Sequence, residues 1–290
     1  MSPANKKSAY FALIFSMIIF GTIGICRRQI PLPSETLACV RGILGSIFLF
    51  LTMKVTGKKF RISKARGSFI LLILTGAMIG FNWILLFEAY NYTTVAIATL
   101  CYYMQPVIVL LISPILFRES ITLRKIACMV VALYGMVLVS GILSPSDTVQ
   151  NAGNTKGVLL GLGAAALYAT VVLLNKKIVG VPVYEKTIVQ LLSASIALIP
   201  YMLLHGTLHP FELESLQLIL LIAVGILHTG IAYALYFSSV EHLPVQTAAL
   251  FSYIDPVTAV LLSALFLHET MTPAGMIGSV MIIGALLFLN

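Results

Sequence analysis

The sequence predicts an all-α, polytopic membrane protein of ten transmembrane helices, arranged as two inverted five-helix repeats. Composition is the first reason: 59% of the 290 residues are hydrophobic and 10% are charged, and the mean hydropathy is +1.02. A soluble domain carries about 25% charged residues, so the medium around this chain must be lipid. The second reason is a series of apolar segments, and the third is a similarity between the two halves of the chain.

The apolar segments are long enough to cross a bilayer as helices, which takes ~20 mostly apolar residues. They are continuous, which excludes a transmembrane barrel, whose strands alternate over ~10 residues. In the first half we expect spans at residues 8–26, 36–53, 67–90, 95–116 and 123–143. In the second half we expect spans at residues 157–179, 187–204, 216–240, 245–267 and 273–289.

A polar segment at residues 144–156, rich in Ser, Thr, Asn and Gly, separates the two groups of spans. We expect residues 1–143 to form the first five-helix repeat and residues 157–290 to form the second. The segment between them is then an extracytoplasmic linker.

Lys and Arg in short loops mark the cytoplasmic side of a membrane protein. Here most of them fall on one side of the predicted spans: Lys6, Lys7, Lys54, Lys58, Lys59, Arg61, Lys64, Arg66, Arg118, Arg124, Lys125, Lys176, Lys177 and Lys186. The loops on the other side contain Arg27, Arg28 and Lys156. The sequence therefore predicts a multi-pass protein of the inner (cytoplasmic) cell membrane, with both termini in the cytoplasm.

The halves match when Pro106 is set against Pro256. Without gaps, identical residues then coincide at Gly80 and Gly230, Phe87 and Phe237, Tyr103 and Tyr253, Glu119 and Glu269, and Thr122 and Thr272. An odd number of spans in each half makes the second half enter the membrane from the opposite face. Such inverted repeats are typical of secondary transporters, whose site lies near the bilayer midplane between the repeats.

Several segments also carry a resemblance to a known family. They are NWILLF at 82–87, YYMQP at 102–106, RESIT at 118–122, HETMT at 268–272, Arg41, and residues 161–168. In these segments the chain resembles the EamA-type transporters of the drug/metabolite transporter superfamily, and the resemblance covers essentially the whole chain. It implies ten helices, a central cavity between the halves and transport of metabolites, but it names no substrate.

Three ionisable residues inside the spans are candidates for substrate binding: Glu88, Asp255 and Arg41. Such side chains usually face a cavity or a partner, because placing them in lipid costs at least ~2.5–3.5 kcal/mol. Each has an alternative interpretation. Glu88 and Arg41 lie near the ends of their spans and could be interfacial, and Asp255 could hold a structural hydrogen bond beside a proline kink. Asp255 or Glu88 is also our candidate for proton exchange during transport.

Aromatic residues gather near the paired prolines, and some of them lie well inside the spans. A buried phenol needs a hydrogen-bond partner, so we add Tyr103 and Tyr253 to the candidate substrate-binding residues, together with Trp83 and Gln105. An aromatic belt at the interface and interhelical hydrogen bonding by Gln105 are the alternatives. The prolines themselves predict either simple kinks or broken helices that open polar backbone to a site.

Other polar residues have structural interpretations. Glu119 and Glu269 each precede a Thr that can cap the next helix, which explains them without substrate contact. Gln190 is expected to hydrogen-bond between helices. His228 is a candidate proton shuttle, but a bond to a neighbouring helix is the simpler explanation.

These features predict a secondary transporter rather than an enzyme. We expect it to move a small polar or amphipathic metabolite, an amino acid or amine first, by alternating access, as a monomer or homodimer. No nucleic-acid partner, cofactor or metal is expected; the cysteines at 26, 39, 101 and 128 show no metal-ligand spacing. A channel or a non-transporting scaffold is the alternative. A membrane-embedded protease is disfavoured, because Asp147 and Asp255 are the only aspartates and HExxH is missing.

Overall fold

A computed structural model of the chain describes residues 3–57, 60, 66–93, 95–139, 155–207, 212–266 and 272–289. Most of the predicted linker, residues 144–154, lies outside this described part. The same is true of Glu269, of four basic loop residues at 58, 59, 61 and 64, and of the side chains of Arg27 and Arg28.

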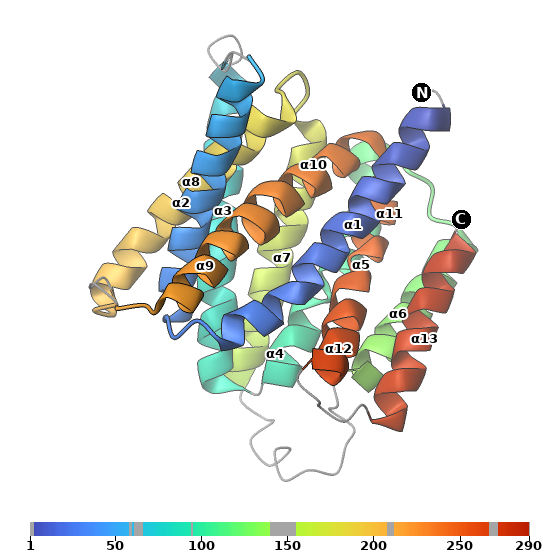
Figure 1. Cartoon of the computed structure of the whole chain (residues 1–290). Helices are drawn as coiled ribbons and strands as arrows, with labels where there is room; N and C mark the ends of the chain where they lie inside the picture. Colours follow the sequence, from blue (N-terminus) through green and yellow to red (C-terminus); the bar gives the residue numbers. More distant parts are fainter. Residues whose placement is uncertain are drawn as a thin grey trace.

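The described residues form helices and no strands (Figure 1). The first half contains α1 (Pro3–Arg28), α2 (Ser34–Val55), α3 (Arg66–Tyr92), α4 (Val95–Tyr102), α5 (Gln105–Phe117) and α6 (Leu123–Val139). The second half contains α7 (Thr155–Lys177), α8 (Val183–Leu204), α9 (Ser215–Ala223), the π-helical turn η3 (Val224–Ile231), α10 (Ala232–His242), α11 (Val245–Phe251), α12 (Ile254–Phe266) and α13 (Pro273–Leu289). In this part of the chain, six helical segments are long and apolar enough to cross a membrane, and α1 and α13 supply shorter apolar stretches.

Most predicted helix bounds agree with the observed ones to within two residues, but two helices begin earlier than predicted: α1 at Pro3 instead of Ser8, and α8. That helix begins at Val183, after Pro182, four residues before the predicted start at Thr187. Proline fixes its own φ near the helical value and is favoured at helix starts. The prediction that Lys186 lies in a loop was therefore wrong, because Lys186 lies in the first turns of α8 and is fully buried.

Two of the predicted spans are broken, as the paired prolines indicated. The first break separates α4 from α5 just before Pro106, and the second separates α11 from α12 just before Pro256. Proline lacks an N–H and is tolerated in the first turn of a helix but not in its interior, so an uninterrupted helix is disfavoured and each proline lies in the first turn of the second segment. Each break leaves backbone groups and a tyrosine, Tyr103 or Tyr253, inside the bundle.

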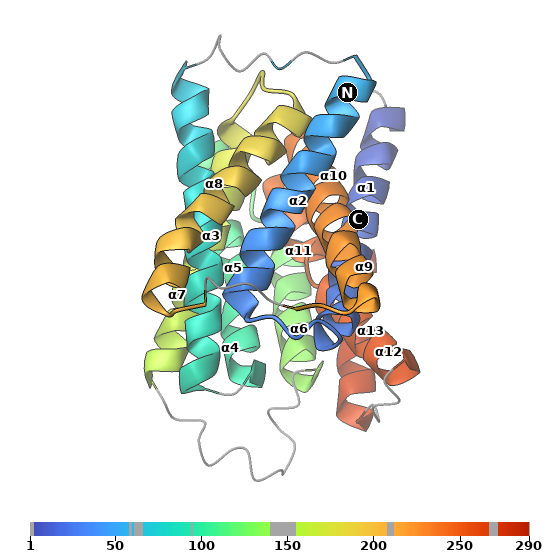
Figure 2. The same cartoon turned by 60° about the vertical axis from the view of Figure 1, so that its left-hand side comes forward.

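The two halves are interleaved in space (Figures 1 and 2). Helix α1 packs on α10 and α12 of the second half, and α7 packs in the same manner on α3, α4 and α5 of the first half. Helix α2 packs on α8, and α6 packs on α13. The packing is thus reciprocal, and the core is shared between the repeats.

Equivalent positions in the two repeats can be read from the structure. Pro33 before α2 matches Pro182 before α8, and these helices end before Gly57 and Gly206, whose φ values of 68° and 65° fall in the left-handed region. We refer to the two ends of the bundle as the Gly57 end and the Gly206 end. At the Gly57 end α2, α7 and α10 finish; at the Gly206 end α3 and α8 finish.

The helices cross at equivalent points as well. A Cβ on Gly80 of α3 would meet the carbonyl oxygen of Ala194 of α8 at 2.6 Å. A Cβ on Gly230 of η3 would meet Phe48 of α2 at 3.1 Å and the carbonyl oxygen of Gly45 at 3.4 Å. Glycine is required at Gly80, where the new atom would meet backbone, and at Gly230 the approach is close but the nearest atom belongs to a side chain.

The π turn marks a difference between the repeats that the sequence analysis missed. Helix α3 has 27 residues, whereas its counterpart from Ser215 to His242 has 28. The spacing between equivalent residues also grows by one between the Gly57/Gly206 pair and the Gly80/Gly230 pair. A π turn accommodates one extra residue within a continuous helix, and such turns are frequent at functional sites.

Candidate functional site

The two helix breaks meet inside the bundle and bring three candidate residues together. Tyr103 donates a hydrogen bond from its hydroxyl to Asp255 Oδ2 at 3.0 Å. Tyr253 donates from its hydroxyl to the carbonyl oxygen of Tyr103 at 2.9 Å, and the two rings stack with centroids 6.1 Å apart. The tyrosines from equivalent positions thus tie the two breaks to each other and leave one carboxylate between them.

A positive charge lies on the other side of this region. The guanidinium of Arg41 on α2 lies 4.6 Å from the ring centroid of Trp83 on α3, in a cation–π contact. Arg41 Nε is buried and has no hydrogen-bond partner, and no carboxylate of the described residues forms an ion pair with it. Tyr233 of α10 is close enough to interact electrostatically with both Arg41 and Asp255.

Aromatic rings connect these two groups. Tyr102 contacts Tyr103 at 5.8 Å and Tyr168 of α7 at 6.0 Å between ring centroids. From Tyr168 the series continues through Tyr236 at 6.5 Å, Phe237 at 5.7 Å and Tyr233 at 5.5 Å. Such an arrangement offers faces for a cation and hydroxyls for polar groups. We call Arg41, Trp83, Tyr103, Tyr253 and Asp255 with these rings the central site.

The other two candidates occupy different surroundings. Gln105 is buried at the start of α5, at the position equivalent to Asp255, and its Nε2 has no hydrogen-bond partner. Glu88 lies further along α3, at the Gly206 end. There it accepts a hydrogen bond from the hydroxyl of Tyr201 on α8 and lies 3.9 Å from His205 Nε2.

A hollow of ≈ 930 Å³ opens at the Gly57 end between α2, α8 and α10. Ala234, next to Tyr233 of the central site, is one of its lining residues. The others include Phe48, Thr52 and Met53 from α2, Tyr184 and Glu185 from α8, and Ser238 from α10. The hollow therefore opens at the Gly57 end beside the part of α10 that carries Tyr233.

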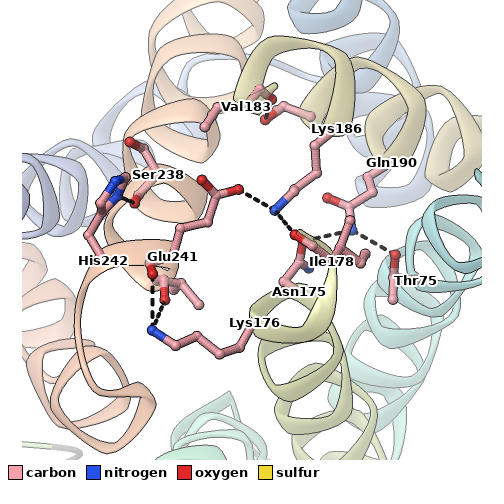
Figure 3. Close-up of polar contacts among 12 residues, drawn as sticks. Thr75, Asn175, Lys176, Ile178, Val183, Lys186, Gln190, Ser238, Glu241 and His242 are labelled. Atoms are coloured by element: carbon pink, nitrogen blue, oxygen red, sulfur yellow. Dashed lines mark hydrogen bonds and ion pairs between the residues drawn. The ribbon is translucent and has the colours of Figure 1, made fainter. Parts of the chain in front are cut away.

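Buried charges hold the helices beside this hollow (Figure 3). Lys186 of α8 is fully buried, pairs with Glu241 of α10 and donates to the carbonyl oxygen of Ile178 at 3.1 Å. Lys176 of α7 donates to the carbonyl oxygens of Val240, Glu241 and Leu243 at 2.9, 3.1 and 2.5 Å. A cation at the last carbonyls of a helix is favoured by the helix dipole, so these lysines fix the end of α10.

The structural interpretations of several polar residues are confirmed. Gln190 bridges helices by donating to Thr75 Oγ1 at 2.6 Å and Asn175 Oδ1 at 3.1 Å. His228 Nε2 lies 2.7 Å from Thr22 Oγ1 of α1. The Thr22 hydroxyl also lies 2.7 Å from the carbonyl oxygen of Ile19.

Glu119 is also structural, and its carboxylate caps a helix of the other repeat. Its carboxylate accepts from the backbone N–H of Val245 at 2.9 Å and of Gln246 at 3.4 Å, at the start of α11. The threonines cap their own helices as predicted: Thr122 Oγ1 accepts from Lys125 N, and Thr272 Oγ1 from Gly275 N. Among the described residues, no group of His, Cys, Asp or Glu side chains could hold a metal ion.

Three features of the structure were not predicted from the sequence: Tyr201, the Lys186–Glu241 pair and the π turn. One feature of the sequence could have predicted the position of Lys186. If Pro182 starts a helix, a charged residue soon after it lies inside that helix. For Tyr201 we find no local signal, since a tyrosine near a predicted helix end is typical of an interfacial belt.

Comparison with known proteins agrees with this architecture. The EamA-like transporter family matches residues 7–141 and again residues 155–290. The relative named "Uncharacterized transporter YxxF" from Bacillus subtilis (strain 168) is 30% identical over 266 residues, which are 92% of this chain and 84% of that protein. Protein PecM from Dickeya dadantii (strain 3937) is 26% identical over 227 residues, covering 76% of this chain and 73% of its own.

A solved crystal structure has the same fold, with a TM-score of 0.84 and 97% of both chains covered at 18% sequence identity. The family matches both halves of the chain, which agrees with the reciprocal packing of the two repeats. The chain therefore belongs to the EamA-like transporter family.

Proposed function

We propose that the protein is a secondary transporter that moves a small polar or amphipathic metabolite across the cytoplasmic membrane by alternating access. Amino acids and related amines are the first candidates. The observation that carries this proposal is the pair of opposite charges in the central site, Arg41 and Asp255, which are not paired with each other.

Charges inside a membrane protein are costly unless a partner neutralises them. Asp255 accepts from Tyr103, and Arg41 rests on Trp83, but neither meets an opposite charge among the described residues. A substrate with an ammonium and a carboxylate group would supply both partners. The tyrosine faces would add cation–π attraction of ~2 kcal/mol or more in a desolvated site.

The proposal includes the topology. Ten spans form two inverted repeats, residues 1–143 and 157–290, with the Gly57 end and both termini in the cytoplasm. The reciprocal packing of α1 and α7 supports the inversion. Lys54, Lys125, Lys176 and Lys177 at the Gly57 end support the orientation. Labelling of a cysteine at position 146 by an impermeant reagent in intact cells tests it, and labelling at position 59 instead contradicts it.

We also propose that transport is coupled to protons through Asp255 or Glu88. Both are carboxylates within helices, and each accepts a hydrogen bond from a tyrosine hydroxyl. Transport by Asp255→Asn and Glu88→Gln across pH tests this. Wild-type rates and pH dependence in both variants would exclude proton coupling through these groups.

The substrate experiment is a thermal-stability screen of purified protein with amino acids, polyamines, choline-like amines, nucleosides and sugars. A ligand at 100 times its Kd stabilises the folded state by ~2.7 kcal/mol. We expect hits among the amino acids or amines that Arg41→Gln, Asp255→Asn or Tyr103→Ala abolishes. Arg124→Gln, at an exposed position on α6, is the control that should keep them. Hits confined to neutral sugars, unaffected by these changes, would overturn the substrate and the site together.

Counterflow in proteoliposomes separates a transporter from a channel. A transporter exchanges labelled substrate for unlabelled substrate and saturates, whereas a channel shows neither property. The same assay, run with the hit from the screen, would identify a scaffold without turnover by the absence of any flux.

A further inference from the structure

The two ends of the bundle carry equivalent helices but different side chains. Glu88 follows Gly80 on α3 by the same number of residues as Ser238 follows Gly230 on α10. Gly206 follows α8 and Gly57 follows α2. Tyr201 precedes Gly206 by the same number of residues as Thr52 precedes Gly57. The pair Glu88 and Tyr201 therefore has an equivalent pair, Ser238 and Thr52, at the opposite end.

The two pairs differ in what they do. At the Gly206 end the hydroxyl of Tyr201 donates to Glu88 across the gap between α8 and α3. The ring of His205 stacks on Tyr201 with centroids 4.1 Å apart. At the Gly57 end Ser238 and Thr52 line the hollow, and the Thr52 hydroxyl is bonded to Phe48 of its own helix at 2.9 Å. Long side chains thus bridge one end where short ones leave space at the other.

A second contact closes the same end. Thr36 at the start of α2 donates to the carbonyl oxygen of Thr207, just after α8, at 3.2 Å. The position equivalent to Thr36 is Glu185, which lines the hollow. Both contacts join the first half to the second. Both must therefore break if the halves separate at the Gly206 end.

We propose that Glu88 and Tyr201, supported by His205, are the gate that keeps the Gly206 end closed while the Gly57 end is open. The inference rests on the proposed alternating access for its role in transport, but the closure itself does not. In this assignment Glu88 is a gating residue and does not contact the substrate. A hydrogen bond to a carboxylate is among the strong ones, which suits a contact that must hold one state and be released in the other.

The test measures access to each end with cysteines, and it needs no substrate. In a background without the four native cysteines at 26, 39, 101 and 128, one reporter is Met202→Cys. Met202 is 2% exposed and lies beside Tyr201 in sequence. The second reporter is Ser238→Cys, on the wall of the hollow. We expect a water-soluble thiol reagent to label Ser238→Cys fast and Met202→Cys slowly.

Adding Tyr201→Phe or Glu88→Ala should raise the labelling rate of Met202→Cys about tenfold or more, since each removes a hydrogen bond to a charged group. Tyr201→Phe keeps the ring and so provides a folded variant without the hydrogen bond. Glu88→Gln keeps the shape and an amide oxygen that can still accept from Tyr201, so it should raise the rate less than Glu88→Ala. Thr52→Val, which removes the equivalent hydroxyl at the open end, is the matched control and should leave the rate unchanged.

The outcomes are separable. An unchanged Met202→Cys rate in both variants, or fast labelling with the contact intact, would overturn the gate. A rise at Met202→Cys with a fall at Ser238→Cys supports both the gate and alternating access. A rise at Met202→Cys without that fall supports the gate while contradicting the proposed mechanism of transport.

Discussion

The Gly57 end and the Gly206 end of this bundle are built from equivalent helices that cross at equivalent glycines, yet one end is hollow and the other is bridged. The backbone arrangement at the crossings is nearly the same, with Gly230 on Gly45 and Gly80 on Ala194. Beyond the crossings, the side chains differ: Tyr201 and Glu88 meet at one end, whereas the equivalent Thr52 and Ser238 line the hollow at the other. The internal repeat therefore accounts for the scaffold, and a few side chains account for its asymmetry.

The two ends also differ in their charged residues. Lys186 and Glu241 pair at the Gly57 end, and the equivalent positions at the other end are Leu37 and Asn91. The ion pair joins α8 to α10, both of the second half, and does not cross between halves. It can therefore persist while the halves move, whereas Glu88 and Tyr201 cannot.

The largest expected effect comes from changing helix length. Deleting Ala77 from α3 would turn the rest of the helix by about 100°. Asn82 would lose its 2.6 Å bond to the carbonyl of Ala164, and Gly80 its place against α8. Deleting Leu227, which is 46% exposed in η3, would bring that helix to the length of α3 by closing the π turn. Size-exclusion chromatography in detergent should show folded protein for the second deletion and aggregate for the first.

If both deletions abolish folding, the additional residue that η3 accommodates is needed for the packing around η3. If both are tolerated, the register of α3 is less constrained than its glycine contacts indicate. Either result would contradict the simple relation between the two helices.

Removing Glu241 should be the most harmful point substitution. Glu241→Ala leaves the fully buried Lys186 without its partner, and an uncompensated buried charge costs about 3–5 kcal/mol of unfolding free energy. Lys186→Ala should cost less, because the Glu241 side chain is 26% exposed and can be hydrated. The exposed equivalent position gives the control: Asn91→Ala should change stability by less than ~0.5 kcal/mol. Unfolding in detergent measures all three, and equal losses for Lys186→Ala and Glu241→Ala would contradict the argument from burial.

Substituting alanine for glycine should lower the unfolding free energy more at Gly80 than at Gly230. In Gly80→Ala the new methyl meets a backbone carbonyl at 2.6 Å, and overpacking of this kind costs typically ~1–3 kcal/mol. In Gly230→Ala it meets the edge of the Phe48 ring at 3.1 Å, which can shift into the adjoining hollow. We expect a loss below ~1 kcal/mol there. A larger loss at Gly230 would show that the hollow end is the more rigid one.

Much of the fold was predictable because membrane insertion imposes simple rules on sequence. Continuous apolar runs and paired prolines located the helices and their breaks, since lipid leaves the backbone few alternatives to a helix. The predicted start of α8 was wrong because the charged Lys186 was predicted to lie in a loop. Local charge opposes helix burial, and only the tertiary partner Glu241 reverses that preference.

Some contacts of the candidate central site were predictable as well. Asp255, Tyr103 and Tyr253 stood out because polar groups at depth need partners, and the structure provides those partners from the other repeat. Which partner each would find was not encoded locally. Glu88 shows the limit: its sequence position suggested the same site, while its contact with Tyr201 depends on how α3 and α8 cross.

The smallest expected effect concerns the caps at the two ends. Glu119 accepts from the first two N–H groups of α11, and losing such a cap costs about 0.5–2 kcal/mol. We expect Glu119→Ala to lower stability by this amount. Glu119→Gln should lower it less, because the amide oxygen still accepts while the charge that favours a helix N-terminus is lost. In the sequence repeat Glu269 stands at the position equivalent to Glu119, so we expect Glu269→Ala to cost as much as Glu119→Ala. Equal losses in detergent unfolding would extend the equivalence of the two ends to their caps. A loss at Glu119 alone would place the caps among the features that distinguish the hollow end from the bridged one.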